Sequence, residues 1–317
     1  LCFFAIGMMN PELPKNNPPH LPLKRTTGRL YHVQVQVQNK KISSGWPLLP
    51  RTNWCRIQSF NLTNQKGDQL NYRIDRLQDS SQLKILTQNL EYFVNLDSYV
   101  FSSELDSIAA SKIPWPNEWD ESFRMYLEPS RFIQSKDPIF KRAVEKNGNP
   151  RSVPIHIAAK ILIRYCLQKI ESNGQYSRNT GKTTTGIDVR GALHAINERK
   201  GSATDLVCVC IATLRAAGIP ARPVLGITNA NAVGTKKVNP QYMVWGEYAL
   251  PNAGWVPFVP KRMRGTVNNL TPTEPWQGLG TLPWLNRRIP LSYNLNMYDI
   301  HRATQYISQM TFLSSPQ

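Results

Sequence analysis

Apolar and polar residues alternate along much of the first third of the chain. The run "LYHVQVQVQNKK" places Val33, Val35 and Val37 on one face and glutamines on the other, which is the pattern of a half-buried strand. Further strand-like runs occur in "NWCRIQSFNLT", "QLNYRIDRL" and "SQLKILTQNLEYFVNL", and turn-forming segments separate them. Several short strands at this spacing predict a β-sandwich over residues 28–102.

The pattern changes to a helical period in the second half of the chain. "VPIHIAAKILIRYCLQKIES" repeats apolar residues at helical spacing, and "IDVRGALHAINERKG" predicts a further short helix. Three strand-like runs follow, in "RPVLGIT", "QYMVWGEYAL" and "GWVPFVP". We therefore expect an α+β domain over residues 126–265, with a helix packed on an antiparallel sheet. The polar segment "NGQYSRNTGKTTTG" inside it reads as a flexible loop.

Three further segments flank or join these two domains. Residues 1–27 begin with the apolar "LCFFAIGMM" and continue with many prolines, as a leader or the remnant of a membrane anchor would. Residues 103–125 mix charges with prolines and are expected to be a linker. Residues 266–317 are rich in Pro, Gly and aromatic residues and predict an extended arm that wraps the domain or reaches a partner. The apolar start favours a periplasmic or other extracytoplasmic, membrane-attached protein.

The net charge of the chain indicates which classes of partner it could bind. The chain holds 38 Lys and Arg against 21 Asp and Glu, a net charge of +17. Such an excess attracts an acidic protein or an anionic membrane surface. Nucleic acid is the weaker prediction, because no zinc-finger, RNP or basic-zipper pattern occurs. The five cysteines form no C-x-x-C pair and the five histidines show no ligand spacing, so we predict neither a metal nor a cofactor.

The segment "GSATDLVCVCIATLRAAGIPAR", residues 201–222, has the signals of a well-formed helix. Ser202 is the expected N-cap, and Asp205 three residues later closes a capping box. Gly218 is placed to end the helix in a left-handed conformation, and Pro220 prevents its continuation.

This segment and three others resemble the bacterial transglutaminase-like superfamily, which has a papain-like fold. "GSATD" and "RAAGIPAR" match the start and end of the family's central helix, "MVWGE" matches its next strand motif, and "GWVPFVP" matches the strand after that. "YLEPSRFIQSKDP" is similar to the segment that leads into these domains, and the preceding β-region resembles the small all-β domain often found before them. The resemblance implies the α+β fold described above and a Cys-His-Asp triad that attacks an amide carbonyl.

Carried over residue by residue, the triad falls on Ala203, Met243 and Val259, which we call the triad positions. Alanine has no nucleophile, methionine cannot carry a proton at neutral pH, and valine cannot orient a charge. We therefore predict a pseudoenzyme that serves as a structural or protein-binding subunit of a hetero-complex.

Two alternatives remain open from the sequence. One is an active acyltransferase or cysteine peptidase whose nucleophile has moved to Cys208 or Ser202. The other is a peptide- or glycan-binding module that uses the old cleft, with Trp245, Trp255 and Ser202 as the candidate binding residues. Burial in the core explains both tryptophans without a ligand, and helix capping explains Ser202, so the binding role is the weaker interpretation.

Overall fold

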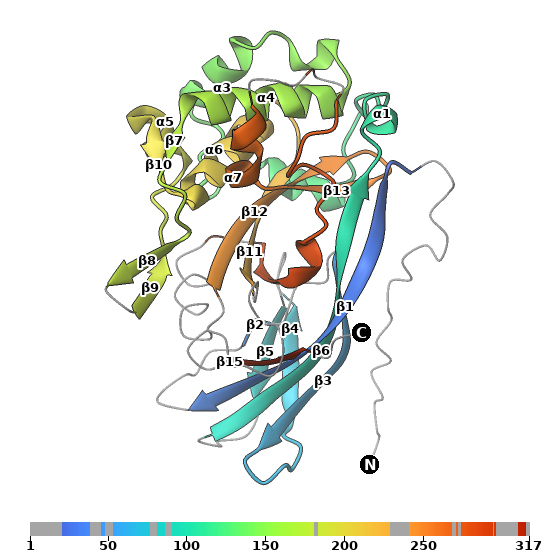
Figure 1. Cartoon of the computed structure of the whole chain (residues 1–317), viewed down its shortest axis with the longest axis vertical. Helices are drawn as coiled ribbons and strands as arrows, with labels where there is room; N and C mark the ends of the chain where they lie inside the picture. Colours follow the sequence, from blue (N-terminus) through green and yellow to red (C-terminus); the bar gives the residue numbers. More distant parts are fainter. Residues whose placement is uncertain are drawn as a thin grey trace.

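A computed structural model of the chain describes residues 21–38, 46–47, 53–76, 81–85, 91–180, 183–228, 241–267, 271, 274–293, 295 and 310–314. Two parts follow one another along the long axis, one built mainly from strands and the other from helices packed on a sheet (Figure 1). The predicted α+β class is confirmed. The described residues exclude the apolar stretch at 1–9, so its expected role as leader or anchor lies outside them.

The strand-rich part consists of two antiparallel sheets. The first has the order β15-β1-β6-β3 and the second the order β2-β5-β4. Their strands are β1 (Leu23–Gln38), β2 (Trp46–Pro47), β3 (Cys55–Asn64), β4 (Tyr72–Arg76), β5 (Ser81–Ile85), β6 (Glu91–Leu105) and β15 (Met310–Ser314). Along β6 the residues from Tyr92 to Val100 alternate between buried and half-buried, as expected of a strand with one face on a core. Strand β1 is present as predicted, and the side chains of Val33, Val35 and Val37 lie outside those described.

The second part is built on an antiparallel sheet of order β13-β12-β11-β14. These strands are β11 (Ala221–Thr228), β12 (Gln241–Leu250), β13 (Gly254–Phe258) and β14 (Arg288–Ser292). The α-helices of the chain are α1 (Ser107–Ala110), α2 (Glu121–Arg124), α3 (Pro138–Glu145), α4 (Ile155–Lys169), α5 (Ala192–Glu198), α6 (Ala203–Ala216) and α7 (Pro260–Met263). Short 3₁₀ turns are η1 (Met125–Leu127), η2 (Pro150–Ser152), η3 (Arg264–Thr266) and η4 (Leu285–Arg287).

Helix α6 is the centre of this part. It packs against α3, α4, α5 and α7 and against β11 and β12 of the sheet. Every residue from Ala203 to Arg215 is buried. The sequence suggests one buried face, whereas the structure surrounds the helix with protein on all sides. That burial fits its composition, because its residues are mostly small or apolar around the whole circumference.

Part of the polar segment expected as a loop is instead paired backbone, and the residues just before it also form a short strand. Strands β8 (Ser177–Thr180) and β9 (Thr183–Ile187) form a hairpin, and β7 (Glu171–Ser172) pairs in parallel with β10 (Lys200–Gly201). The threonine run explains the difference, since β-branched residues favour strands even where the sequence is polar.

Other boundaries also differ from the sequence reading. Strand β1 begins at Leu23, before the predicted domain start at 28, and the predicted linker 103–125 contains the end of β6 together with α1 and α2. The C-terminal segment wraps both parts, because β14 pairs with β11 and β15 pairs with β1. Side-chain contacts reinforce the wrap. The Tyr31 hydroxyl donates to the Asn286 carbonyl at 2.8 Å, and Ser102 Oγ donates to the Pro283 carbonyl at 2.6 Å.

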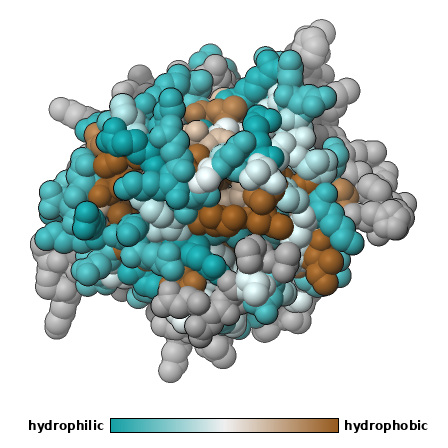
Figure 2. All heavy atoms as spheres, turned by 90° about the horizontal axis from the view of Figure 1, so that it is seen from above, coloured by the Kyte–Doolittle hydropathy of each residue, from teal (hydrophilic) through white to brown (hydrophobic). Residues whose placement is uncertain are grey.

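The helical end of the molecule presents a largely hydrophilic surface on which hydrophobic residues gather in a few areas (Figure 2). Among the described residues, the large hydrophobic side chains that are exposed are Ile108, at 67%, and Trp284, at 38%. No described helix is long and apolar enough to cross a membrane.

Candidate functional site

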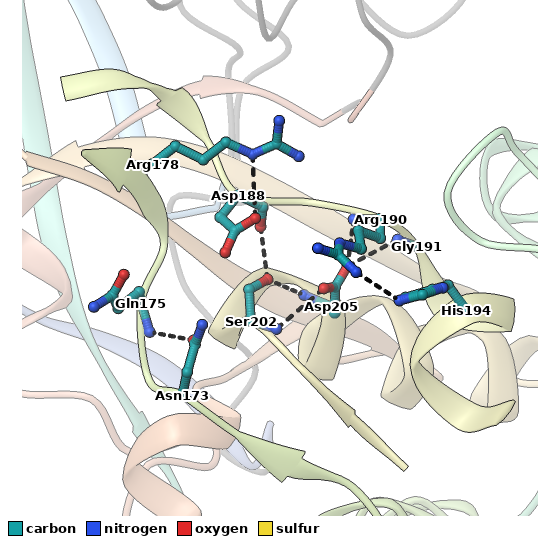
Figure 3. Close-up of polar contacts among 9 residues, drawn as sticks. All are labelled: Asn173, Gln175, Arg178, Asp188, Arg190, Gly191, His194, Ser202 and Asp205. Carbon is teal, nitrogen blue, oxygen red and sulfur yellow. Dashed lines mark hydrogen bonds and ion pairs between the residues drawn. The ribbon is translucent and has the colours of Figure 1, made fainter. Parts of the chain in front are cut away.

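The N-terminus of α6 is held by the capping box that the sequence predicts. Ser202 Oγ accepts the Asp205 backbone N–H at 3.0 Å, and Asp205 Oδ2 accepts the Ser202 backbone N–H at 3.0 Å. Figure 3 shows both contacts beside the loop that precedes α5. Gly201 permits this arrangement, since a Cβ atom there would lie 2.8 Å from the Asp205 Cβ.

Asp205 also fastens the loop before α5 to this helix. Its Oδ1 accepts the backbone N–H groups of Arg190 at 2.7 Å and Gly191 at 2.8 Å (Figure 3). The side chain is buried, so its carboxylate satisfies three backbone donors from two chain segments. This role is structural, because both carboxylate oxygens of Asp205 already accept hydrogen bonds from backbone N–H groups.

Ser202 is similarly occupied. Its hydroxyl donates to the Asp188 carbonyl at 2.6 Å while it accepts from Asp205, and it is 3% exposed. The Asp188 carboxylate in turn pairs with Arg178 Nε at 3.2 Å (Figure 3). His194 lies on α5 with its Nε2 at 3.3 Å from Arg190 Nη1. Of the candidate binding residues, Ser202 is therefore fully used by capping in this structure.

The three triad positions lie on α6, β12 and the start of α7. Ala203 is the first residue of α6, is buried, and donates its N–H to the Gln175 carbonyl at 2.8 Å. Met243 is half-buried on β12 and packs against the main core. Val259 is buried as the N-cap of α7, and its N–H donates to the Gly278 carbonyl at 2.7 Å.

The register of the sheet relates the last two of these positions. The β12–β13 ladder ends with Gly246 opposite Phe258, so Trp245 and Val259 come next on the two segments of the chain. Met243 is two residues further along β12 and shares a face with Trp245. Met243 therefore lies two residues along β12 from the position next to Val259, and α6 packs against β12.

Both candidate binding tryptophans are buried. Trp245 is 2% exposed and lies over Gly226, where a Cβ atom would come within 2.5 Å of the indole. Trp255 is 8% exposed, with its ring centroid 5.2 Å from that of Phe123 and 4.9 Å from that of Tyr126. Burial accounts for both residues without a ligand, and their binding role stays a prediction.

A buried ion pair lies beside Trp255 and was not assigned a role from the sequence. Arg222 on β11 donates from Nη2 to Glu247 Oε2 at 2.7 Å and from Nε at 2.9 Å. Its guanidinium lies between the rings of Trp255 and Tyr293, at 3.9 and 3.6 Å from their centroids. Burial raises the pKa of Glu247, and the Arg222 charge opposes that rise. Arg222 ends the GIPAR segment and Glu247 ends the MVWGE segment, so both residues belong to motifs visible in the sequence. Only the register of β11 on β12 shows that they pair.

The cysteines of α6 lie deep in the core. Cys208 and Cys210 are 0% exposed. Burial raises the pKa of both thiols well above the ordinary value, so they are protonated at neutral pH. Among the described residues, no group of three or more His, Cys, Asp and Glu side chains is placed to hold a metal ion.

Comparison with known protein families gives a match, which covers the helix and strands around the triad positions. Residues 155–260, from the start of α4 to the start of α7, match the family model of the transglutaminase-like superfamily. This segment is a transglutaminase-like domain. It includes α6, both sheet motifs and the three triad positions. Comparison with curated protein sequences gives no match.

Comparison with solved structures finds similarity to the following three proteins. A candidate cysteine protease from Cytophaga hutchinsonii has a TM-score of 0.53 at 16% identity, over 93% of this chain and 90% of that one. The periplasmic domain of TgpA from Pseudomonas aeruginosa gives 0.36 at 14% identity, over 74% and 90%. Red sea bream transglutaminase gives 0.28 at 12% identity, over 77% and 46%. At such identities the first likeness speaks for the fold alone.

Proposed function

We propose that this chain is a catalytically inactive transglutaminase-like protein that serves as a structural or protein-binding subunit of a larger, membrane-associated assembly. The observation that carries the proposal is the set of apolar side chains at all three triad positions. Ala203, Met243 and Val259 supply no nucleophile, no general base and no orienting carboxylate.

The contacts around the triad positions support a role in folding. A thiolate at the first residue of α6 would gain from the helix dipole, but Ala203 places a methyl group there. Val259 is packed in the main core, and Met243 packs against it. The polar residues nearby, Asp205 and Ser202, are engaged by backbone groups rather than directed at a reacting atom.

The relocated-nucleophile alternative gains no support from the burial of its candidates. Cys208 is fully buried with a raised pKa, and Ser202 already donates and accepts hydrogen bonds. Iodoacetamide labelling of the native protein discriminates the two functions, because only the thiolate reacts. We expect no labelling at Cys208 until the chain is unfolded. Fast labelling of one cysteine at low pH would favour the enzyme.

The setting of the proposed subunit follows from charge and composition. The net charge of +17 favours an acidic protein partner or an anionic membrane surface, and the apolar stretch at residues 1–9 favours an extracytoplasmic location. An interface that depends on charge weakens as salt screens it.

The test of the proposal is the mass of the native particle. The untagged protein is isolated from its source in mild detergent, and its mass is measured at low salt and at high salt. We expect a particle of fixed stoichiometry that contains a second chain and dissociates as salt rises. A lone monomer at both salt concentrations would contradict the assembly role.

A further inference from the structure

A buried arginine on the sheet of the second part has no acidic partner among the described residues. Arg288, at the start of β14, is 4% exposed, and its Nη1 makes no hydrogen bond in the described part of the chain. Its guanidinium lies 6.0 Å from the ring centroid of Trp245. Among the described residues no carboxylate pairs with it, in contrast to Arg222, which has Glu247. A buried charge is costly unless it is paired, so the Arg288 guanidinium is a candidate anion-binding group.

A second buried donor lies within electrostatic range of Arg288. The Tyr176 hydroxyl is buried and has no hydrogen-bond partner in the described part of the chain, and its electrostatic neighbours are Arg288 and Arg262. Burial raises the pKa of Tyr176 to about 12 and lowers that of Arg288 to about 10. At neutral pH the tyrosine therefore keeps its proton and the arginine keeps its charge, and both are donors that need an acceptor.

The surface next to this cluster is also cationic. Lys261 and Arg262 are exposed on α7, with Lys261 Nζ 5.5 Å from the ring centroid of Tyr176. The Arg262 guanidinium lies 4.3 Å from the ring centroid of Trp284, which is itself partly exposed. These side chains make the surface near the buried pair positive, and such a field concentrates anions there.

The cluster also adjoins the triad positions. Tyr176 follows Gln175, whose carbonyl accepts the Ala203 N–H, and Trp245 lies two residues from Met243. The site is therefore in the region of the domain where the resemblance locates its chemistry, but it is made from different residues.

We propose that Arg288 and Tyr176 form a carboxylate-binding site, reached past Lys261 and Arg262. A planar guanidinium matches a carboxylate, which accepts several donors at once, and the tyrosine hydroxyl supplies a neutral donor beside it. The site itself does not depend on whether the domain is catalytic. That the carboxylate comes from an acidic side chain of a protein partner rests on the proposed function.

The first measurement uses acetate as the bare carboxylate. Thermal unfolding of the whole chain is followed at pH 7 and constant ionic strength while chloride is replaced by acetate. Ligand that binds only the folded state raises the melting temperature. We expect a saturable rise for the native protein and none for Arg288→Met. Tyr176→Phe should weaken the apparent acetate affinity about tenfold, since a hydrogen bond to a charged group is lost.

Arg124→Met is the matched control, because Arg124 is an exposed arginine paired with Glu118 on the surface. It should keep the full acetate response. If acetate shifts the melting temperatures of the native protein, Arg288→Met and Arg124→Met equally, the shift is a general effect of the salt. That result would contradict the proposed site. If Arg288→Met fails to fold, Tyr176→Phe and saturation-transfer NMR of acetate on the native protein decide the question in the same way.

Two blocked peptides identify the source of the carboxylate. They are identical except that one carries a central Glu and the other a Gln. We expect the Glu peptide to displace acetate at least about tenfold more effectively, with the difference lost in Arg288→Met. Acetate binding without peptide binding would keep the site and overturn the protein partner as its source. The native-particle mass tests the subunit role separately, so the two failures are distinguishable.

Discussion

His156 should make the stability of this protein depend on pH. Its side chain is fully buried on α4, with Nδ1 at 2.6 Å from the Tyr248 hydroxyl. Burial, reinforced by the charge of Lys160, lowers the pKa of His156 from 6.5 to about 3. The folded state therefore keeps the neutral imidazole where the unfolded chain takes up a proton. Stability is full above pH 6.5 and is lost as pH falls from there toward 3.

The size of the effect follows from the two pKa values. Each unit of pH between the unfolded and folded pKa contributes about 1.4 kcal/mol, so at pH 5 the cost of the buried neutral histidine is about 2 kcal/mol. At pH 7 the unfolded histidine is mostly neutral and the cost nearly vanishes. We therefore expect the free energy of unfolding to fall by about 2 kcal/mol more, between pH 7 and pH 5, in the native protein than in a variant without this group.

The assay is urea unfolding at pH 7, 6 and 5 for three proteins. His156→Asn removes the titrating ring and keeps an amide near the Nδ1 position, so it should show the smaller pH dependence. Tyr248→Phe removes the hydrogen bond and keeps the histidine, so its stability should start lower and fall with pH as the native protein does. The reasoning is refuted if His156→Asn and the native protein lose the same free energy between pH 7 and pH 5.

Other predictions concern the contacts that hold the site. Asp205→Ala leaves three backbone N–H donors without their acceptor and should lower the free energy of unfolding by at least about 3 kcal/mol in urea titration. Glu247→Gln removes the charge opposite buried Arg222 and should cost about 3–5 kcal/mol, part of which a second change, Arg222→Met, restores. Gly226→Ala drives a methyl group into the Trp245 ring and should lower stability by about 1–3 kcal/mol, measured by thermal unfolding.

The sequence predicts those features of the fold that depend on residues close together in the chain. Ser202 and Asp205 lie three positions apart, so the capping box at the start of α6 is readable in the sequence and is confirmed. The strands β11, β12 and β13 are likewise where their apolar runs placed them. The hairpin β8–β9 was missed because its polar residues hid the β-branched preference of its threonines.

Contacts between residues far apart in the sequence could not be predicted from local patterns. Arg222 and Glu247 pair only through the register of two strands, and Tyr176 comes within electrostatic range of Arg288 across more than a hundred residues of chain. The full burial of α6 exceeds the prediction because an amphipathic helix is expected to keep one side in solvent, whereas protein surrounds α6. Pairing of the C-terminal strands with β1 and β11 also depends on tertiary packing rather than on local preference.

Acyl transfer by the purified native protein tests the central claim most directly. A glutamine-containing peptide is incubated with a fluorescent primary amine, and both amine incorporation and peptide cleavage are followed at neutral pH. With Ala203, Met243 and Val259 at the triad positions, we expect neither product above the rate without protein. Steady turnover that disappears in Cys208→Ala or Ser202→Ala would contradict the account and identify an active enzyme with a relocated nucleophile.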